Sequence, residues 1–285
     1  MGFDMQFLHN VPAPAKLNVF LHITGRRDDG YHLLQSTFML IDWWDVLHFD
    51  RRDDGQLLRE DLSTPLPPLD LSLKAAHALQ QASGSRYGAL IRVQKNLPSE
   101  AGLGGGSSDA ASTLLALNRL WELNWPLSRL LPLGANLGAD VPFFLGGRNA
   151  WVQGIGEQLQ PIDLPPAQFV VLKPQLGLST ATIFQDPLLV RNTQPATIQD
   201  FAAQPYAFGR NDLQAVAQRL CPEVSQAIYW LENQSLQARM TGSGSAVFAK
   251  IEPSTVLAHP PAGWTWRICS NLEVHPLHRW VSCDD

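Results

Sequence analysis

Residues 95–121 carry the strongest chemical pattern in the chain, a glycine-rich loop followed by apolar residues at helical spacing. The loop glycines leave backbone N–H groups uncovered: Gly102, Gly104, Gly105 and Gly106. We expect a helix from there to Trp121, its first turn capped by Ser107, Ser108 and Asp109. Because the N-terminus of a helix attracts anions, this stretch predicts a phosphate site, and the triphosphate of ATP is the obvious ligand.

Two common phosphate motifs do not fit this loop. A P-loop ends in Gly-Lys-Ser/Thr, and the chain contains no Gly-Lys pair. The dinucleotide fingerprint needs glycine at its first, third and sixth positions, and counting from Gly102 the sixth residue is Ser107. A flexible linker is the remaining alternative, but linkers are not typically followed by a strong amphipathic helix.

A lysine and an aspartate are the best candidates for acid–base chemistry. Residues 14–24 alternate as a strand does, so Lys16 and Asn18 lie side by side on one face. Asp140 lies in an apolar segment, where a carboxylate needs a partner such as Lys16 to stay ionised. Such a pair could accept the proton of a hydroxyl while the lysine offsets charge on a transferred phosphoryl group. A turn or helix cap is an equally good interpretation of Asp140.

Other side chains could bind a second ligand or a cation. Tyr31, His32 and Phe184 could hold a flat ring, although each alone also fits ordinary core. A second glycine loop, Thr241–Ser245, suggests a wall facing the first loop. Mg²⁺ prefers oxygen ligands, which could come from Glu100, Ser107 and Asp109, but the sequence leaves the metal ligands undecided.

Composition limits the class of protein. A chain of 285 residues with 45% hydrophobic content can bury a core as one large domain or two lobes. A formal charge of -5 argues against nucleic acid as the main partner. There is no signal peptide pattern and no apolar run of the roughly 20 residues that cross a membrane. The chain has three cysteines, Cys221, Cys269 and Cys283, whose number and spacing indicate neither a disulfide framework nor a zinc site. We therefore expect a cytoplasmic protein.

The elements that position these residues mix strands and helices in α+β fashion. Strands are expected within 14–24, 31–41, 45–50, 89–94, 149–153, 168–172, 246–251 and 264–268. Helices are expected after the glycine loop and at 71–82, 127–137 and 223–233. Asp54-Gly55 predicts a hairpin turn that folds the chain back on residues 45–50. The proline-containing segment 161–166 is the candidate boundary between lobes of residues 1–160 and 161–285.

Six motifs carry a resemblance to a known family: Pro14–Gly25, Asp29–His32, Gly102–Ala111, Leu137–Phe143, Thr241–Ser245 and His275–Arg279. On these residues the chain resembles the GHMP small-molecule kinases over nearly its whole length. The Gly-Tyr-His triplet at residues 30–32 is similar to that of the branch whose substrate is cytidine diphosphate methylerythritol. The resemblance implies a two-lobed α+β GHMP kinase fold with the active site in the cleft between the lobes.

The resemblance also implies a reaction and a set of residues. ATP, with Mg²⁺, would phosphorylate the 2-hydroxyl of the small-molecule substrate, with Asp140 as catalytic base and Lys16 as its charged partner. Tyr31 and Phe184 would enclose the cytosine and His32 would bind its edge, within a substrate set of Asn18, Tyr31, His32, Thr180 and Phe184. ATP would contact Lys95, Pro98, Gly102, Leu103, Gly104, Gly105, Gly106, Ser107 and Ser108.

Two alternatives remain open at this point. Another GHMP kinase could act on a different alcohol, or the same fold could serve as a non-catalytic ligand sensor. The partner expected in each case is a small molecule, without nucleic acid or membrane. The protein could be a monomer or a homodimer.

Overall fold

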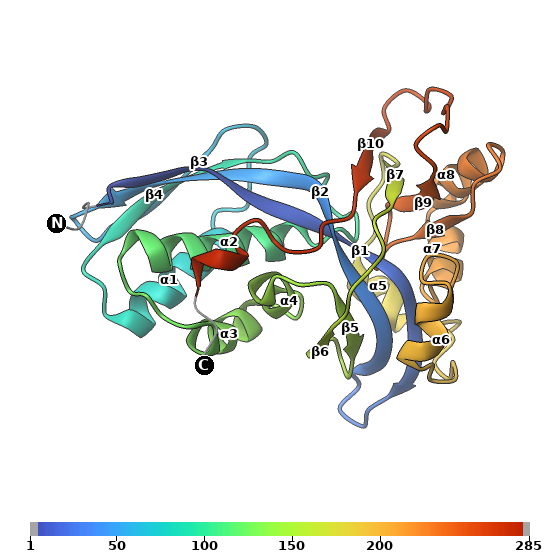
Figure 1. The fold of residues 1–285 in the computed structure, drawn as a ribbon, viewed down its shortest axis with the longest axis horizontal. Coiled ribbons are helices and arrows are strands. Elements are labelled where there is room, and N and C mark those ends of the chain that lie inside the picture. Colours follow the sequence, from blue (N-terminus) through green and yellow to red (C-terminus); the bar gives the residue numbers. More distant parts are fainter. Residues whose placement is uncertain (1–4, 282–285) are drawn as a thin grey trace.

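Two long strands run through the centre of the molecule. The computed structural model describes residues 5–281, and in it β1 (Phe7–Arg26) pairs antiparallel with β2 (His32–Arg52). The two expected strands at 31–41 and 45–50 are one continuous strand, because Leu47 and Phe49 are both fully buried and continue the inward face of β2. Both strands extend from one lobe into the other (Figure 1).

The first sheet has the strand order β3-β4-β2-β5-β6, with β1 paired to β2. Its other strands are β3 (Leu57–Asp61), β4 (Gly88–Gln94), β5 (Ala150–Gln153) and β6 (Gln158–Pro161). The predicted hairpin at Asp54-Gly55 is wrong, since β3 pairs parallel with β4 and not with β2. The connection from β3 to β4 contains a helix, which is the crossover that a parallel pair requires.

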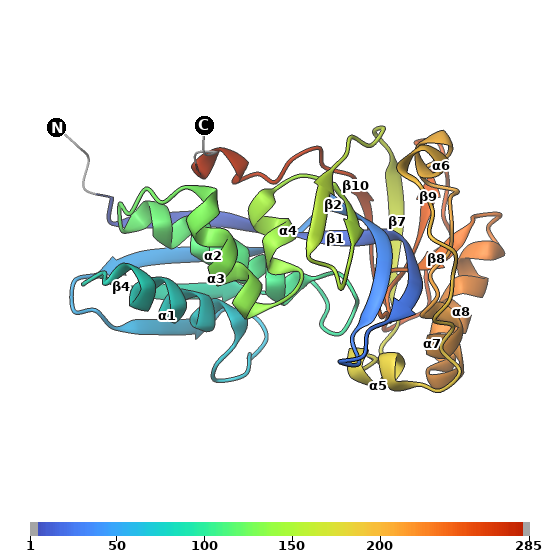
Figure 2. The ribbon, with the colours of Figure 1, turned by 90° about the horizontal axis from the view of Figure 1, so that it is seen from below.

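Four helices cover one face of the first sheet: α1 (Leu71–Ser83), α2 (Gly105–Leu120), α3 (Leu127–Leu137) and α4 (Val141–Gly146) (Figures 1 and 2). Helix α2 is buried on every side from Ser108 to Asn118, and Leu114 and Leu117 have no exposed surface. A helix enclosed in this way is held by packing, and not by its own capping. Its N-terminus is therefore fixed in place by the core.

The second sheet has the order β10-β7-β9-β8: β7 (Gln168–Lys173), β8 (Ala238–Met240), β9 (Val247–Ile251) and β10 (Thr265–Ser270). Strand β7 is interior, as its continuous apolar run predicted. The helices of this lobe are α5 (Thr180–Gln185), α6 (Ile198–Ala203), α7 (Gln214–Leu220) and α8 (Pro222–Glu232). The long loops between them leave room for α5 to approach the first lobe.

The two lobes share a core and a returning tail. One buried cluster combines Leu17 and Met39 of the central strands with Phe169 and Phe248 of the second sheet. After β10 the chain returns to the first lobe, where Leu272 N–H donates to Leu40 O at 2.8 Å. The tail ends in the short helix η1 (His278–Trp280) beside α2 (Figure 1). The proposed division at residues 160 and 161 remains a prediction.

No helix within residues 5–281 is long and apolar enough to cross a membrane. Cys221 and Cys269 are free thiols and are buried. Burial raises the pKa of the Cys269 thiol to about 12, so that it remains protonated. Cys283 lies outside the described residues.

Candidate active site

A cleft of about 1020 Å³ lies between the lobes. Ligand pockets commonly measure ~300–1,000 Å³, so this cleft has room for two small molecules together. Most of the residues predicted for the site line it: Lys16, Asn18, Lys95, Pro98, Gly102, Leu103, Gly104, Gly105, Gly106, Ser107, Asp140, Thr180 and Phe184. Three predicted residues do not belong to its lining: Tyr31, His32 and Ser108.

The glycine loop ends directly at the N-terminus of α2. Gly104 is the N-cap, with a φ of 74°, and no side chain caps the helix. The expected capping by Ser107, Ser108 and Asp109 is wrong because the helix begins ahead of them. Ser108 N–H donates the first helical bond to Gly104 O at 2.9 Å, so the preceding N–H groups have no acceptor within the helix. They are available to an anion.

The second glycine loop packs against the first. Gly102 has a φ of 71°, and a Cβ added there would lie 2.3 Å from Thr241 O. Ser245 N–H donates to Glu100 O at 3.0 Å, which joins the two loops further. Gly242, Ser243 and Gly244 line the same cleft as the phosphate loop. The two loops thus form adjacent walls.

Lys16 and Asp140 meet beside the phosphate loop. Lys16 Nζ lies 3.6 Å from Asp140 Oδ2, donates to Asn18 Oδ1 and lies 4.7 Å from the centre of the Phe38 ring. Asp140 occupies the N-cap position of α4, yet its side chain makes no capping hydrogen bond. Of the two interpretations of Asp140, the structure favours the charged pair. Lys16 is tied to the loop itself, since its N–H donates to Leu103 O at 2.9 Å.

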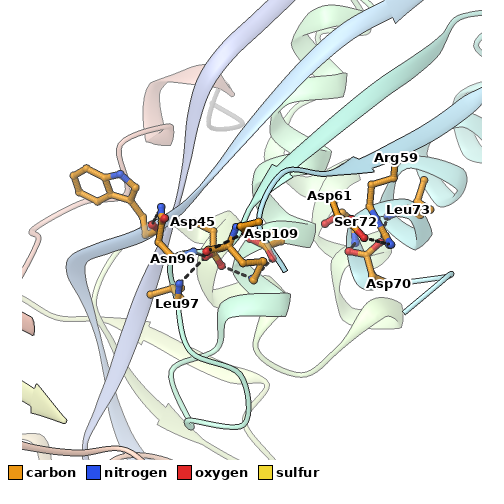
Figure 3. Close-up of polar contacts among 12 residues, drawn as sticks. Asp45, Arg59, Asp61, Asp70, Ser72, Leu73, Asn96, Leu97 and Asp109 are labelled. Atoms are coloured by element: carbon orange, nitrogen blue, oxygen red, sulfur yellow. Dashed lines mark hydrogen bonds and ion pairs between the residues drawn. The ribbon is translucent and has the colours of Figure 1, made fainter. Parts of the chain in front are cut away.

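Lys95 lies at the cleft between two buried carboxylates. Its Nζ lies 2.5 Å from Asp109 Oδ2 and also binds Asp45 Oδ2. Asp45 accepts a second set of bonds from the N–H groups of Asn96 and Leu97, at 2.6 and 2.8 Å (Figure 3). Burial lowers the pKa of Lys95, but the two carboxylates outweigh this and raise it. Burial raises the pKa of Asp109 to about 7, and the Lys95 charge opposes this only in part.

The sequence interpretation missed Asp45, whose only signal is an acid within an apolar strand. Its carboxylate has no exposed surface, and a buried carboxylate requires partners of the kind it has. Asp45 joins β2 to the segment after β4, and Lys95 extends that link to α2. The cluster therefore anchors the first turns of α2, from which the phosphate loop emerges.

A wall at 66–74 also belongs to the cleft. Leu66, Asp70 and Lys74 line the cleft on the side of α1. Arg59 fixes this segment by donating to Asp70 Oδ1 at 2.6 Å and to Leu66 O at 3.2 Å. Asp70 in turn accepts from Ser72 and Leu73 N–H at the start of α1 (Figure 3). The other residues of this wall in the cleft are Pro67, Leu69 and Leu71, so it offers mainly apolar surface to a nucleotide base, and Leu71 lies beside Gly106 of the glycine loop.

The aromatic residues are only partly brought together. The rings of His32 and Phe184 lie 5.2 Å apart between centroids, at 42°. The Tyr31 side chain is exposed, and no ring contact joins it to Phe184 in the described part of the chain. Thr180 lies next to Ser243 of the second glycine loop, with their hydroxyl oxygens 2.7 Å apart. His32 also accepts a hydrogen bond from Arg191, a residue that the sequence interpretation did not single out.

Residues of the cleft offer few ligands for a cation. Within residues 5–281 there is no group of three histidine, cysteine or acidic side chains that could hold a metal ion. The carboxylate of Glu100 lies against Gly177, where an added Cβ would be 2.0 Å from Oε2. Asp109 Oδ1 is buried without a hydrogen-bond partner, and Ser107 lines the same cleft. Of the three candidate ligands, Ser107 and Asp109 therefore fit a magnesium ion whose other ligands would be phosphate oxygens.

The fold and the site have close counterparts among known proteins. Residues 70–148 match the GHMP kinases N terminal domain, and residues 192–256 match the GHMP kinases C terminal domain. A mevalonate kinase crystal structure shares the fold with a TM-score of 0.67 at 11% identity, covering 93% of this chain and 98% of that one. The chain belongs to the GHMP kinases.

Curated relatives narrow this to one branch. The 4-diphosphocytidyl-2-C-methyl-D-erythritol kinase of Albidiferax ferrireducens is 60% identical over 280 residues, 98% of each chain. That of Delftia acidovorans is 61% identical over 282 residues, 97% of this chain and 98% of the relative. A crystal structure of 4-(cytidine 5'-diphospho)-2C-methyl-D-erythritol kinase has a TM-score of 0.76 at 33% identity, covering 91% of this chain and 98% of that one.

Proposed function

We propose that the protein is an ATP-dependent kinase that phosphorylates the 2-hydroxyl of 4-diphosphocytidyl-2-C-methyl-D-erythritol in non-mevalonate isoprenoid precursor synthesis. The observation that carries this is the Lys16–Asp140 pair beside the uncapped N-terminus of α2. A triphosphate bound at that N-terminus would bring its terminal phosphate to the pair. The names of the relatives supply the identity of the acceptor.

ATP would occupy the half of the cleft formed by the first lobe. The free N–H groups of Gly105, Gly106 and Ser107 would bind phosphate oxygens. The wall at 66–74 would enclose the adenosine, and Leu103 and Pro98 would pack against it. Lys95 would add positive charge to this half, and its two carboxylates would hold its ammonium in place. The Ser108 hydroxyl is buried, so Ser108 would contribute to ATP binding only as part of the first turn of α2.

Asp140 and Lys16 would perform the transfer. Asp140, whose side chain is 29% exposed, would accept or orient the proton of the acceptor hydroxyl. Lys16 would stabilise the charge that develops on the phosphoryl group, and Asn18 would hold Lys16 and contact the substrate. The near-complete burial of Lys16 limits competing water and strengthens its interaction with the phosphoryl group.

The substrate's cytosine would lie near His32, Phe184 and Tyr31, with Thr180 beside the rest of the molecule. Phe184 faces the cleft and His32 packs against its ring, so both can contact one base. Tyr31 is exposed and would close over the base from the turn before β2. In this arrangement the Lys16–Asp140 pair would stand between the cytosine and the phosphate loop, as a two-substrate kinase requires.

Mg²⁺ would accompany ATP and reduce the negative charge of the triphosphate. Ser107 and Asp109 are the side chains that would hold it with the phosphates, whereas the Glu100 carboxylate lies against Gly177. We place the protein in the cytoplasm, where its free thiols remain reduced, as a monomer or homodimer.

A coupled ADP-release assay tests the proposal. We expect turnover with 4-diphosphocytidyl-2-C-methyl-D-erythritol and little with bare methylerythritol phosphate, which lacks the cytidine. Equal turnover on both would indicate another GHMP kinase activity. Binding of ATP and substrate without any ADP would indicate a ligand sensor, and either result would overturn the proposal.

A further inference from the structure

Arg191 connects two parts of the substrate half of the site without lining the cleft. Its Nε donates to His32 Nε2 at 2.9 Å. Its Nη2 donates to Phe184 O at 3.2 Å and to Asp186 O at 2.7 Å, and its Nη1 donates to Leu189 O at 2.9 Å. Within residues 5–281 no carboxylate pairs with this guanidinium. Its hydrogen bonds go to one histidine and three backbone carbonyls.

These bonds couple the end of a helix to the start of a strand. Phe184 and Asp186 lie at the C-terminal end of α5, where carbonyls have no partner within the helix. His32 is the first residue of β2, at the end of that strand that packs against the second lobe. Arg191 therefore binds both the backbone of Phe184 and the ring of His32. The two rings that would meet the base are placed relative to each other by Arg191.

The bond to His32 also decides where the histidine carries its proton. A guanidinium only donates hydrogen bonds and stays protonated, so Nε2 of His32 must accept through its lone pair. A neutral imidazole has one N–H, which must then be on Nδ1. No group in the described part of the chain accepts from Nδ1. The Nδ1–H group is available to a ligand.

We propose that Arg191 is a positioning residue that holds His32 as the neutral Nδ1–H tautomer, so that His32 presents a hydrogen-bond donor to the substrate's base. The choice of base rests on the function proposed above. Cytosine carries acceptors at N3 and O2, whereas uracil carries a proton on N3. Uracil still accepts hydrogen bonds at O2 and O4, so a fixed donor favours cytosine where it meets N3, and the reversed tautomer would place a lone pair against that acceptor.

The charges around His32 keep it neutral. Burial, Arg191 and Arg26 all lower the pKa of His32. Arg191 comes from the segment after α5, and Arg26 of β1 pairs directly with His32 in the sheet. Both neighbours are cationic, so protonation of the ring is opposed from each side. Removal of Arg191 would raise the pKa of His32 and allow its neutral ring to adopt either tautomer.

Nitrogen NMR of the free protein tests the tautomer directly. In the wild-type protein at pH 7.5 we expect two-bond ¹H–¹⁵N correlations that identify Nδ1 as protonated and Nε2 as unprotonated. An Nε2–H form would overturn the proposal without any variant. This measurement involves no substrate, so its result is independent of whether the proposed kinase activity is correct.

Arg191→Met then tests the role of the arginine. In Arg191→Met we expect a mixture of His32 tautomers and a higher His32 pKa. Arg219→Met is the matched control, in which we expect the tautomer and pKa of His32 to be unchanged. Arg219 also binds Asp186, but it binds the carboxylate and not the backbone carbonyl, and it does not contact His32. A general loosening of the end of α5 would change both variants alike. An unchanged His32 spectrum in Arg191→Met would refute the assignment.

Kinetics provide a readout that a purely structural role would not change. At pH 8 we expect Arg191→Met to raise the KM for the cytidine substrate about two- to fivefold, the reciprocal of the fraction of His32 that keeps the Nδ1–H tautomer, with the KM for ATP unchanged. At pH 6 the difference from wild type should shrink, because a protonated His32 regains a proton on Nδ1. A KM defect that is constant with pH, or a parallel rise in the KM for ATP, would contradict the proposal.

Discussion

Two carboxylates of the cleft, Asp140 and Asp109, show how a side chain's neighbours decide its role. Asp109 has a pKa near 7, which alone would recommend it as a general base. Its side chain is nevertheless only 3% exposed, and its Oδ2 is bound by Lys95 in the half of the cleft proposed for ATP. Asp140 is open to the cleft and faces Lys16. Geometry, considered before pKa, supports Asp140 as the proposed base.

Asp140→Asn tests that assignment. The amide keeps the shape of the side chain but cannot accept the hydroxyl proton, so we expect kcat to fall about 10²-fold or more with little change in the substrate KM. Steady-state kinetics with isothermal titration of substrate would measure both. Asp163→Asn, at a residue whose side chain is 86% exposed, is the control and should keep full activity. Near-normal turnover of Asp140→Asn would rule out this role.

At the scale of elements, the proposed phosphate site depends on how α2 is placed and not on how it is capped. The helix is enclosed by core residues such as Leu114, and its first turns are tied to β2 through Lys95 and Asp45. These contacts fix the N-terminus while its N–H groups stay free. A capping side chain would compete with the phosphate for the same donors. An uncapped, immobile N-terminus is what anion binding needs.

Gly102→Ala should disrupt the contact between the two glycine loops. A Cβ at residue 102 would lie 2.3 Å from Thr241 O, and the backbone has a positive φ. We expect the free energy of unfolding to fall by about 1–3 kcal/mol and the KM for ATP to rise. Urea unfolding measures the first effect. Gly146→Ala, where an added Cβ meets nothing within 4 Å, should change stability by less than ~0.5 kcal/mol. Equal stability of the two variants would contradict this account.

At the scale of the whole molecule, the lobes are not independent units. Leu17 of β1 and Phe169 of β7 belong to one buried cluster, and the C-terminal tail returns to pack on the first lobe. Figure 2 shows the tail running from β10 back over the first lobe. The cleft is formed by both lobes, so its shape depends on this shared core. Relative movement of the lobes would have to preserve that cluster.

The shared core predicts one cooperative unfolding transition. Thermal or urea unfolding followed by far-ultraviolet circular dichroism and by tryptophan fluorescence should give coincident curves. A fragment of residues 1–160 should fail to fold, because it exposes the buried faces of β1 and β2 that contact β7. Two separate transitions, or a stably folded fragment, would show that the lobes are autonomous.

Helices and strands could be predicted from the sequence where the pattern that determines them lies within a few residues. The helix at 127–137 was predicted to the residue, because its apolar spacing and the following Gly138 act within a few residues. The strand at 168–172 was predicted as interior from its continuous apolar run. The glycine loop, and the pairing of Lys16 with Asp140, came from residue types that phosphate chemistry requires.

Only the tertiary structure decided which segments meet. Strand pairing is set by contacts between residues distant in sequence, so the turn at Asp54-Gly55 could not reveal that β3 pairs parallel with β4. The same reason hid Asp45, whose partner Lys95 is 50 residues away in the sequence, and the hydrogen bond between Arg191 and His32, which are 159 residues apart. The sequence by itself determined the chemistry available to this protein, since that depends on residue type. The fold determined which groups act together, because burial and hydrogen bonding depend on neighbours in space.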